Sequence, residues 1–184
     1  MKVLFATSNP HKVKEAVGVG KDYGIEFVQL KESYPEIRDE DVAKIAEDGA
    51  RHIHDNTKKP VVVDDTGLYI DALNGFPGPF SAYTFKKVGC QGILRLMDGM
   101  NNRDAVFVSA VGYCDGKKLL TFRGECKGTI TSAMRGPPVF GYDPIFLPEG
   151  QDKTFAEDGQ MKDRVSHRRK SFDAFCRWFV SKNK

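Results

Sequence analysis

An apolar run that leads directly into two acidic residues most constrains the fold of this chain. Val61, Val62 and Val63 are followed at once by Asp64 and Asp65. Three consecutive β-branched residues predict a buried strand, and the carboxylates then lie where that strand is expected to end. Because ligands of open α/β sheets bind outside the carboxyl ends of the strands, this segment is a candidate functional site. A solvated turn is the alternative, since Asp is a common turn residue.

The start of the chain predicts a second strand, followed by a helix. Residues 1–6 are mostly apolar, and residues 7–12 read Thr-Ser-Asn-Pro-His-Lys. Asn9 is a favoured N-cap, and Pro10 suits the first helical position. A helix N-terminus favours phosphate, and Lys12 adds a full positive charge. The segment is not a Walker loop, because the Gly-x-x-x-x-Gly-Lys spacing is absent. An ordinary capped helix is the alternative.

Hydrophobic periodicity along the rest of the chain predicts helices between early strands and a long hairpin later. Strands are predicted over residues 25–30, 105–114 and 117–128, the last two joined by a turn at Asp115-Gly116. Helices are predicted after a cap at Asp39, over residues 89–99 and from about residue 166. This order predicts an α/β fold with a mixed, twisted sheet. The length of 184 residues fits a single domain without a separable linker.

Composition and charge exclude several classes of protein. The net charge of +3 is too small to indicate a nucleic-acid partner. The four cysteines have no Cys-x-x-Cys spacing and are expected to be reduced. The chain has no apolar run of membrane-spanning length and no signal peptide. We therefore expect a cytoplasmic protein that does not bind membranes.

The acidic pair is also a candidate metal site. Two neighbouring carboxylates repel each other, so a metal ion, a Lys or Arg side chain, or a shared proton should compensate them. Mg²⁺ is typically held by one or two carboxylates together with substrate phosphates. Glu36 lies in an extended loop between a predicted strand and helix, and it could supply the second carboxylate beside Asp65.

Two later segments contain groups that could hold a nucleotide. Phe140-Gly141-Tyr142-Asp143 combines aromatic faces with a carboxylate, which suits stacking on a base but also suits a hydrophobic loop anchor. Lys162, His167 and Arg168 belong to a basic cluster before the last helix, for which a solvated charge run is the ordinary explanation. A nucleotide pocket requires phosphate donors, metal-binding acids, a stacking ring and readers of the base edge together.

Five segments, taken in order, resemble the inosine triphosphate pyrophosphatase family, whose members remove deaminated purine nucleotides. The matching segments are Thr7–Lys12, Asp64–Leu68, Ala72–Gly78, Phe140–Phe146 and Ser166–Arg168. They span nearly the whole chain, and several long motifs in register are more specific than any one alone. The resemblance implies an elongated α/β fold with a mixed twisted sheet flanked by helices, two lobes with a central cleft, and a homodimer.

The resemblance also implies an activity and the residues that perform it. The reaction is Mg²⁺-dependent hydrolysis of ITP, dITP or XTP to the monophosphate and pyrophosphate. Glu36 and Asp65 would bind the metal, and Asp65 would also act as general base toward water. The substrate would be bound by a larger set: Thr7, Ser8, Asn9, Pro10, His11, Lys12, Thr66, Phe140, Gly141, Tyr142, Asp143, Lys162, His167 and Arg168.

The chain departs from the family pattern at three places. Pro137-Pro138-Val139 replaces a loop that is often Gly-rich, Arg169 stands where a Gly commonly follows the His-Arg pair, and His52 stands in place of a frequent Lys. These differences bear on substrate range and phosphate contacts more than on the type of reaction.

Three other functions remain as alternatives. A haloacid-dehalogenase-type phosphatase would need Asp-x-Asp spacing, whereas Asp64 and Asp65 are adjacent. A Maf-like nucleotide pyrophosphatase is disfavoured by the Phe-Gly-Tyr-Asp-Pro and Ser-His-Arg segments. A non-enzymatic nucleotide- or RNA-binding module would use the basic cluster and the aromatic side chains.

Overall fold

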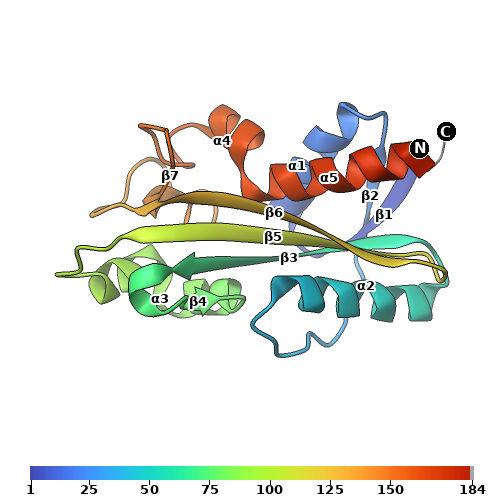
Figure 1. The fold of residues 1–184 in the computed structure, drawn as a ribbon, viewed down its shortest axis with the longest axis horizontal. Helices are drawn as coiled ribbons and strands as arrows, with labels where there is room; N and C mark the ends of the chain where they lie inside the picture. The colour runs from blue at the N-terminus through green and yellow to red at the C-terminus, as the bar shows by residue number, and fades with distance from the viewer. Residues whose placement is uncertain (183–184) are drawn as a thin grey trace. The chain divides into compact units, whose positions relative to one another are not determined.

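The computed structural model describes residues 1–182 and has the α/β fold that the sequence predicts. The strands are β1 (Lys2–Ala6), β2 (Glu26–Leu30), β3 (Val61–Ile70), β4 (Pro77–Gly78), β5 (Asp104–Cys114), β6 (Leu119–Ile130) and β7 (Phe146–Pro148). The helices are α1 (Pro10–Lys21), α2 (Val42–Thr57), α3 (Ser81–Leu96), α4 (Gly159–Val165) and α5 (His167–Lys182), with short 3₁₀ turns η1 (Asp71–Leu73) and η2 (Asp143–Ile145). Figure 1 shows these elements along the chain.

The sheet is mixed, as predicted. Its strand order is β2-β1-β3-β5-β6-β7, and β4 pairs with β3. β1 runs parallel to both β2 and β3, whereas β3–β4 and β6–β7 are antiparallel. None of the helices within residues 1–182 has the length and apolar character needed to cross a lipid bilayer.

The chain divides into two compact units. Unit 1 contains Met1–Thr66, Ser109–Gly124 and the segment from His167 onward, and unit 2 contains Gly67–Val108 and Glu125–Ser166. In unit 1, α1 and α5 cover one face of the strands and α2 covers the other (Figure 1). The first face is rich in aromatic side chains, including Phe5, Phe27, Phe172 and Phe175. The second face is aliphatic, with Val61, Val63, Ala50 and Ile53 at its centre.

Unit 2 has one hydrophobic core. Leu68 and Ile70 of β3 pack there with Ile93 and Met97 from α3 and its C-terminal end. Aromatic side chains from β5, β7 and the following loop complete the core: Phe107, Phe146 and Phe155.

Several predicted boundaries were wrong. The cap of α2 is Asp41, whose side chain accepts the N–H of Ala43, while Asp39 accepts the N–H of Asp41 instead. Helix α3 begins at Ser81 and not near residue 89, and Gly89 interrupts it with a φ of 61°. Helix α4 was not predicted. The predicted cap at Asn9 with Pro10 after it is confirmed, as are the hairpin strands and the last helix.

Candidate active site

The sequence predicted that the two acidic residues lie at the end of a strand, but they lie within strand β3. β3 continues through Thr66 and Gly67 to Ile70. Because successive side chains of a strand point to opposite faces, Asp64 shares the face of Val62, which packs with the α1–α5 core. Asp65 shares the face of Val63, which packs with α2. The two carboxylates therefore have different surroundings.

Asp64 is the centre of a buried ionic cluster. Its carboxylate accepts a hydrogen bond from the Arg168 guanidinium at 2.9 Å and from the Ser109 hydroxyl at 2.6 Å. The Lys12 ammonium lies 3.2 Å from the same carboxylate and donates to the Asp64 main-chain oxygen at 2.8 Å. Although burial alone would raise it, the Lys12 and Arg168 charges hold the pKa of Asp64 well below its usual range. Asp64 is therefore an ionised structural group.

Arg168 belongs to this cluster and is not part of a solvated charge run. Its side chain is 1% exposed. Besides Asp64, the guanidinium donates to the Glu15 carboxylate at 2.8 Å and to the Thr66 hydroxyl at 2.9 Å. Its neighbour His167 is 3% exposed. From the sequence, these residues were predicted to form a separate basic cluster before the last helix. In the fold, Arg168 contacts Asp64 of β3 and Glu15 of α1.

The N-terminus of α1 has the geometry that the sequence predicts. The Asn9 side chain accepts the N–H groups of His11 and Lys12, and the N–H of Asn9 donates to the Thr7 hydroxyl. Ser8, Pro10 and His11 are exposed. The segment Thr7–Lys12 is thus an ordered loop and first helical turn, with the Lys12 ammonium held in place by Asp64.

Asp65 has a different environment from Asp64. Its Oδ2 atom is buried and has no hydrogen-bond partner among the described residues. Burial raises the pKa of Asp65 to about 6; the Asp64 and Glu36 carboxylates add to this effect and the Lys12 ammonium opposes it. Burial raises the pKa of Tyr34 as well, and the Glu36 carboxylate adds a smaller effect in the same direction. Asp65, Glu36 and Tyr34 are therefore electrostatic neighbours.

The residues of this region fit a divalent cation. A buried carboxylate oxygen without a hydrogen-bond donor is an unusual feature, and a hard cation would satisfy it. Glu36 is exposed and can contribute a second carboxylate. Within residues 1–182 no group of three or more His, Cys, Asp or Glu side chains is arranged as a metal cage. A site of two carboxylates, completed by substrate phosphates, is the arrangement that Mg²⁺ commonly uses.

The predicted nucleoside-binding residues of unit 2 form their own cluster. Lys162 donates to the Asp143 carboxylate at 2.7 Å, and both residues are 7% exposed. The Lys162 ammonium lies 4.7 Å from the centre of the Phe140 ring. Tyr142 is buried, donates to the Ser81 main-chain oxygen and packs edge-on against Phe85. Within this segment Tyr142 therefore has the role of a hydrophobic anchor.

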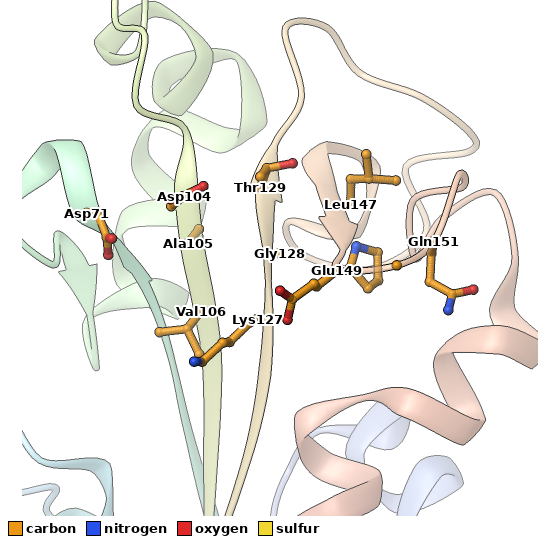
Figure 2. Close-up of a pocket in the computed structure, with 12 residues that line it drawn as sticks. Asp71, Asp104, Ala105, Val106, Lys127, Gly128, Thr129, Leu147, Glu149 and Gln151 are labelled. Carbon is orange, nitrogen blue, oxygen red and sulfur yellow. The ribbon is translucent and has the colours of Figure 1, made fainter.

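Unit 2 also has a hollow of about 470 Å³ on strands β5, β6 and β7 (Figure 2). Carboxylates and one ammonium line it: Asp71, Asp104, Glu149 and Lys127, all of them exposed. None of the predicted site residues lines this hollow. It is therefore not the candidate active site.

Three residues of the Asp64 cluster have no signal in the sequence. Glu15 lies mid-helix in α1, Ser109 in the middle of β5 and Ser171 in α5. Each is separated from Asp64 by tens of residues and matches no motif. Only the paired strands and the packing of α1 and α5 bring them together.

Comparison with known proteins identifies the family of this chain. A relative from Methanopyrus kandleri, named dITP/XTP pyrophosphatase, is 49% identical over 97% of this chain and 96% of its own length. A relative of the same name from Thermococcus kodakarensis is 46% identical over 97% of both chains. The solved structure of a HAM1 protein from Coxiella burnetii is 29% identical with a TM-score of 0.86, covering 98% of this chain and 99% of that one. The model of the Ham1 family matches residues 3–178, and the chain belongs to this family.

Proposed function

We propose that this protein hydrolyses deaminated purine nucleoside triphosphates, namely ITP, dITP and XTP, to the monophosphate and pyrophosphate. The observation that carries the proposal is Asp65, a buried carboxylate with one oxygen lacking a partner, beside the Lys12 ammonium and the Glu36 carboxylate. The names of the relatives, dITP/XTP pyrophosphatase, supply the substrate class.

The triphosphate is assigned to the loop and first helical turn of Thr7–Lys12. The positive end of the α1 dipole and the Lys12 ammonium in its first turn suit a polyphosphate. Asp64 fixes the Lys12 ammonium through two contacts, so that this charge is positioned before substrate arrives. Phosphoryl transfer depends mainly on positioning and charge neutralisation, and Lys12 contributes to both.

Asp65 is assigned as the general base that orients the attacking water, and with Glu36 as a ligand of Mg²⁺. When bound, the cation would neutralise phosphate charge and polarise the bond that breaks. The unpartnered Oδ2 of Asp65 supports both assignments, because neither a metal ligand nor a base should be saturated by protein donors.

The nucleoside is assigned to Phe140, Gly141, Asp143 and Lys162 of unit 2, with Tyr142 anchoring their loop against Ser81 and Phe85. In unit 1, Thr66, His167 and Arg168 are assigned as further substrate contacts. The Phe140 ring can stack on a purine, and the Lys162–Asp143 pair offers both a donor and an acceptor. Each terminal nitrogen of Arg168 carries a second hydrogen, and we assign one to the 6-keto oxygen. Adenine has an amino donor at this position, so ATP would leave this one hydrogen of the guanidinium without an acceptor.

We further propose that the protein acts as a homodimer of single-domain chains in the cytoplasm, without nucleic-acid or membrane partners. These assignments come from the resemblance and the composition of the chain. Gel filtration with light scattering would measure the oligomeric state directly.

The decisive assay is phosphate detection with ITP, with and without added inorganic pyrophosphatase. A signal that needs the coupling enzyme identifies pyrophosphate as the product. A signal without it indicates a phosphatase, and no signal at all indicates a binding module. The same assay with dITP, XTP and ATP gives the order of substrates, and EDTA followed by Mg²⁺ tests the metal.

The Asp65→Asn variant tests the catalytic assignment. Removing a general base should lower kcat by roughly 10²–10⁴-fold, while the fold survives because the substitution keeps the size of the side chain. Asp98→Asn serves as the control, because it makes the same exchange of carboxylate for amide at an exposed residue elsewhere on the surface. Near-normal turnover of Asp65→Asn with Mg²⁺ would contradict the assignment.

A further inference from the structure

A chain of buried hydroxyl groups connects α5 to the Asp64 carboxylate. The Ser109 hydroxyl donates to Asp64 Oδ1 at 2.6 Å, and the Ser171 hydroxyl lies 2.8 Å from the Ser109 oxygen. Ser109 and Ser171 are both 0% exposed. None of the predicted functions uses these two residues, although the Ser109–Asp64 bond is as short as a charge-assisted hydrogen bond.

Only the link from Ser109 to Asp64 has a fixed hydrogen-bond direction. The Asp64 carboxylate contacts the Arg168 and Lys12 cations and accepts the single hydrogen of Ser109. The single hydrogen of Ser171 has two acceptors within reach, the Ser109 oxygen at 2.8 Å and the Arg168 main-chain oxygen at 3.1 Å. The Ser109 hydroxyl dipole therefore points toward the negative charge of Asp64 and stabilises it.

Close backbone packing at Gly124 sets the position of the helix in this chain. A Cβ atom at Gly124 of β6 would lie 2.2 Å from the His167 main-chain oxygen and 2.4 Å from the Ser171 nitrogen. Helix α5 thus begins in direct contact with the strand. This close approach brings both Arg168 and Ser171 within hydrogen-bond distance of their partners on β3 and β5.

We propose that Ser109 is a positioning residue for the hydrolytic reaction, acting through Asp64; this inference rests on the proposed function. Ser109 donates to Oδ1 at 2.6 Å, where the Thr66 hydroxyl makes only a longer contact of 3.4 Å, whereas Arg168 and Lys12 contact Oδ2. The hydroxyl therefore fixes the rotation of the carboxylate plane. That rotation determines where Oδ2 holds the Lys12 ammonium, and it steadies the main chain that leads into Asp65.

Loss of the hydroxyl should affect the rate more than substrate binding. In Ser109→Ala the Asp64 carboxylate keeps both cations but loses the short bond to Oδ1, where only the 3.4 Å contact from Thr66 remains. Small displacements of groups that act in the transition state cost rate, so kcat should fall by about tenfold, with KM for ITP changing less than about threefold.

Val111→Ala is the matched control for a merely structural effect. Val111 is 0% exposed, lies two residues further along β5 and belongs to the core beneath α5. Its truncation should lower the melting temperature at least as much as Ser109→Ala does, yet leave kcat at 25 °C within about twofold. A double-mutant cycle with Asp64→Asn tests whether Ser109 acts through Asp64. Once the carboxylate is absent, Ser109→Ala should change kcat less than about twofold.

Each result is decisive. A selective fall in kcat for Ser109→Ala, absent from Val111→Ala and lost in the Asp64→Asn background, supports the proposal. An unchanged kcat in Ser109→Ala, or equal losses in Ser109→Ala and Val111→Ala, overturns it, and these two variants decide alone if Asp64→Asn does not fold. A wild-type protein that releases no pyrophosphate from ITP instead contradicts the proposed function, and the positioning role is refuted with it.

Discussion

The buried guanidinium of Arg168 offers the sharpest test of the energetics of unit 1. Its side chain is 1% exposed and makes three hydrogen bonds of 2.8–2.9 Å to Asp64, Glu15 and Thr66. In Arg168→Ala two carboxylates lose their shared cation, and the Asp64 side chain is 0% exposed. Removing one partner of a buried ion pair costs about 3–5 kcal/mol. Because Asp64 keeps Lys12 and Ser109, we expect a loss near 3 kcal/mol, at the low end of this range.

The adjacent arginine provides a control for the loss of positive charge. Arg169 lies on the same helix and is 28% exposed, and it contacts Asp173 of α5 and Asp22 at the end of α1. Exposed ion pairs contribute about 0–1 kcal/mol, so Arg169→Ala should be close to wild type in stability. The two variants remove the same charge one residue apart, and only burial distinguishes them.

Urea unfolding followed by tryptophan fluorescence is the appropriate assay. The only tryptophan, Trp178, lies in α5 and reports on unit 1. A loss of about 3 kcal/mol corresponds to a melting temperature lower by roughly 6–12 °C in a chain of this size. A loss in Arg168→Ala below about 1.5 kcal/mol, the value of one ordinary hydrogen bond, would refute the reasoning. Equal losses in Arg168→Ala and Arg169→Ala would refute it as well.

Three further outcomes follow from single contacts. Lys12→Ala should weaken triphosphate binding far more than nucleoside or monophosphate binding, and equal losses by calorimetry would indicate a structural role instead. Burial, with the nearby Asp143 carboxylate, raises the pKa of the Cys90 thiol to about 11, so the folded state keeps its proton at pH 9, where the unfolded thiol loses it. Stability from Cys90 is therefore complete below about pH 8.5 and is lost as pH rises toward 11, a decline that Cys90→Ala should reduce in thermal melts at graded pH. Gly18→Ala should stabilise α1 by about 0.5–1 kcal/mol, because the space around its Cβ is open. Gly49→Ala should not stabilise α2, because its Cβ would lie 2.6 Å from the Tyr34 ring. Equal gains of the two variants in thermal melts would contradict this difference.

Local signals in the sequence predicted the elements that local interactions determine. The cap at Asn9, the β5–β6 hairpin and the apolar stripe of α5 depend on residues close in sequence, and all are confirmed. Helix α3 was only partly predicted, because its cap residue Phe80 makes no side-chain hydrogen bond and Gly89 breaks its periodicity. Helix α4 has seven residues, too few for a periodic pattern to emerge.

The candidate site was predicted as a list of residues, but not as a set of contacts. From the sequence, Arg168 was predicted to belong to an exposed basic run. Its partners Asp64 and Glu15 could not be recognised, because they lie 104 and 153 residues away in sequence. No periodicity or motif encodes such pairing. Ser109 was missed for the same reason, since an isolated serine in a strand has no distinguishing pattern until the fold places it beside a carboxylate.

The alternation of a β-strand explains why two adjacent aspartates have different roles. Since neighbouring side chains of β3 face opposite sides, the cations that satisfy Asp64 leave Oδ2 of Asp65 unpartnered. The sequence alone suggested that one positive group should compensate both charges. The structure instead compensates Asp64 within the protein and leaves Asp65 with a raised pKa and an unsatisfied oxygen. A one-residue shift of register would exchange the two faces. Asp64 therefore acts within the fold by joining β3, α1 and α5 through Arg168 and Lys12, and the adjacent Asp65 keeps the unpartnered oxygen on which the proposed function rests.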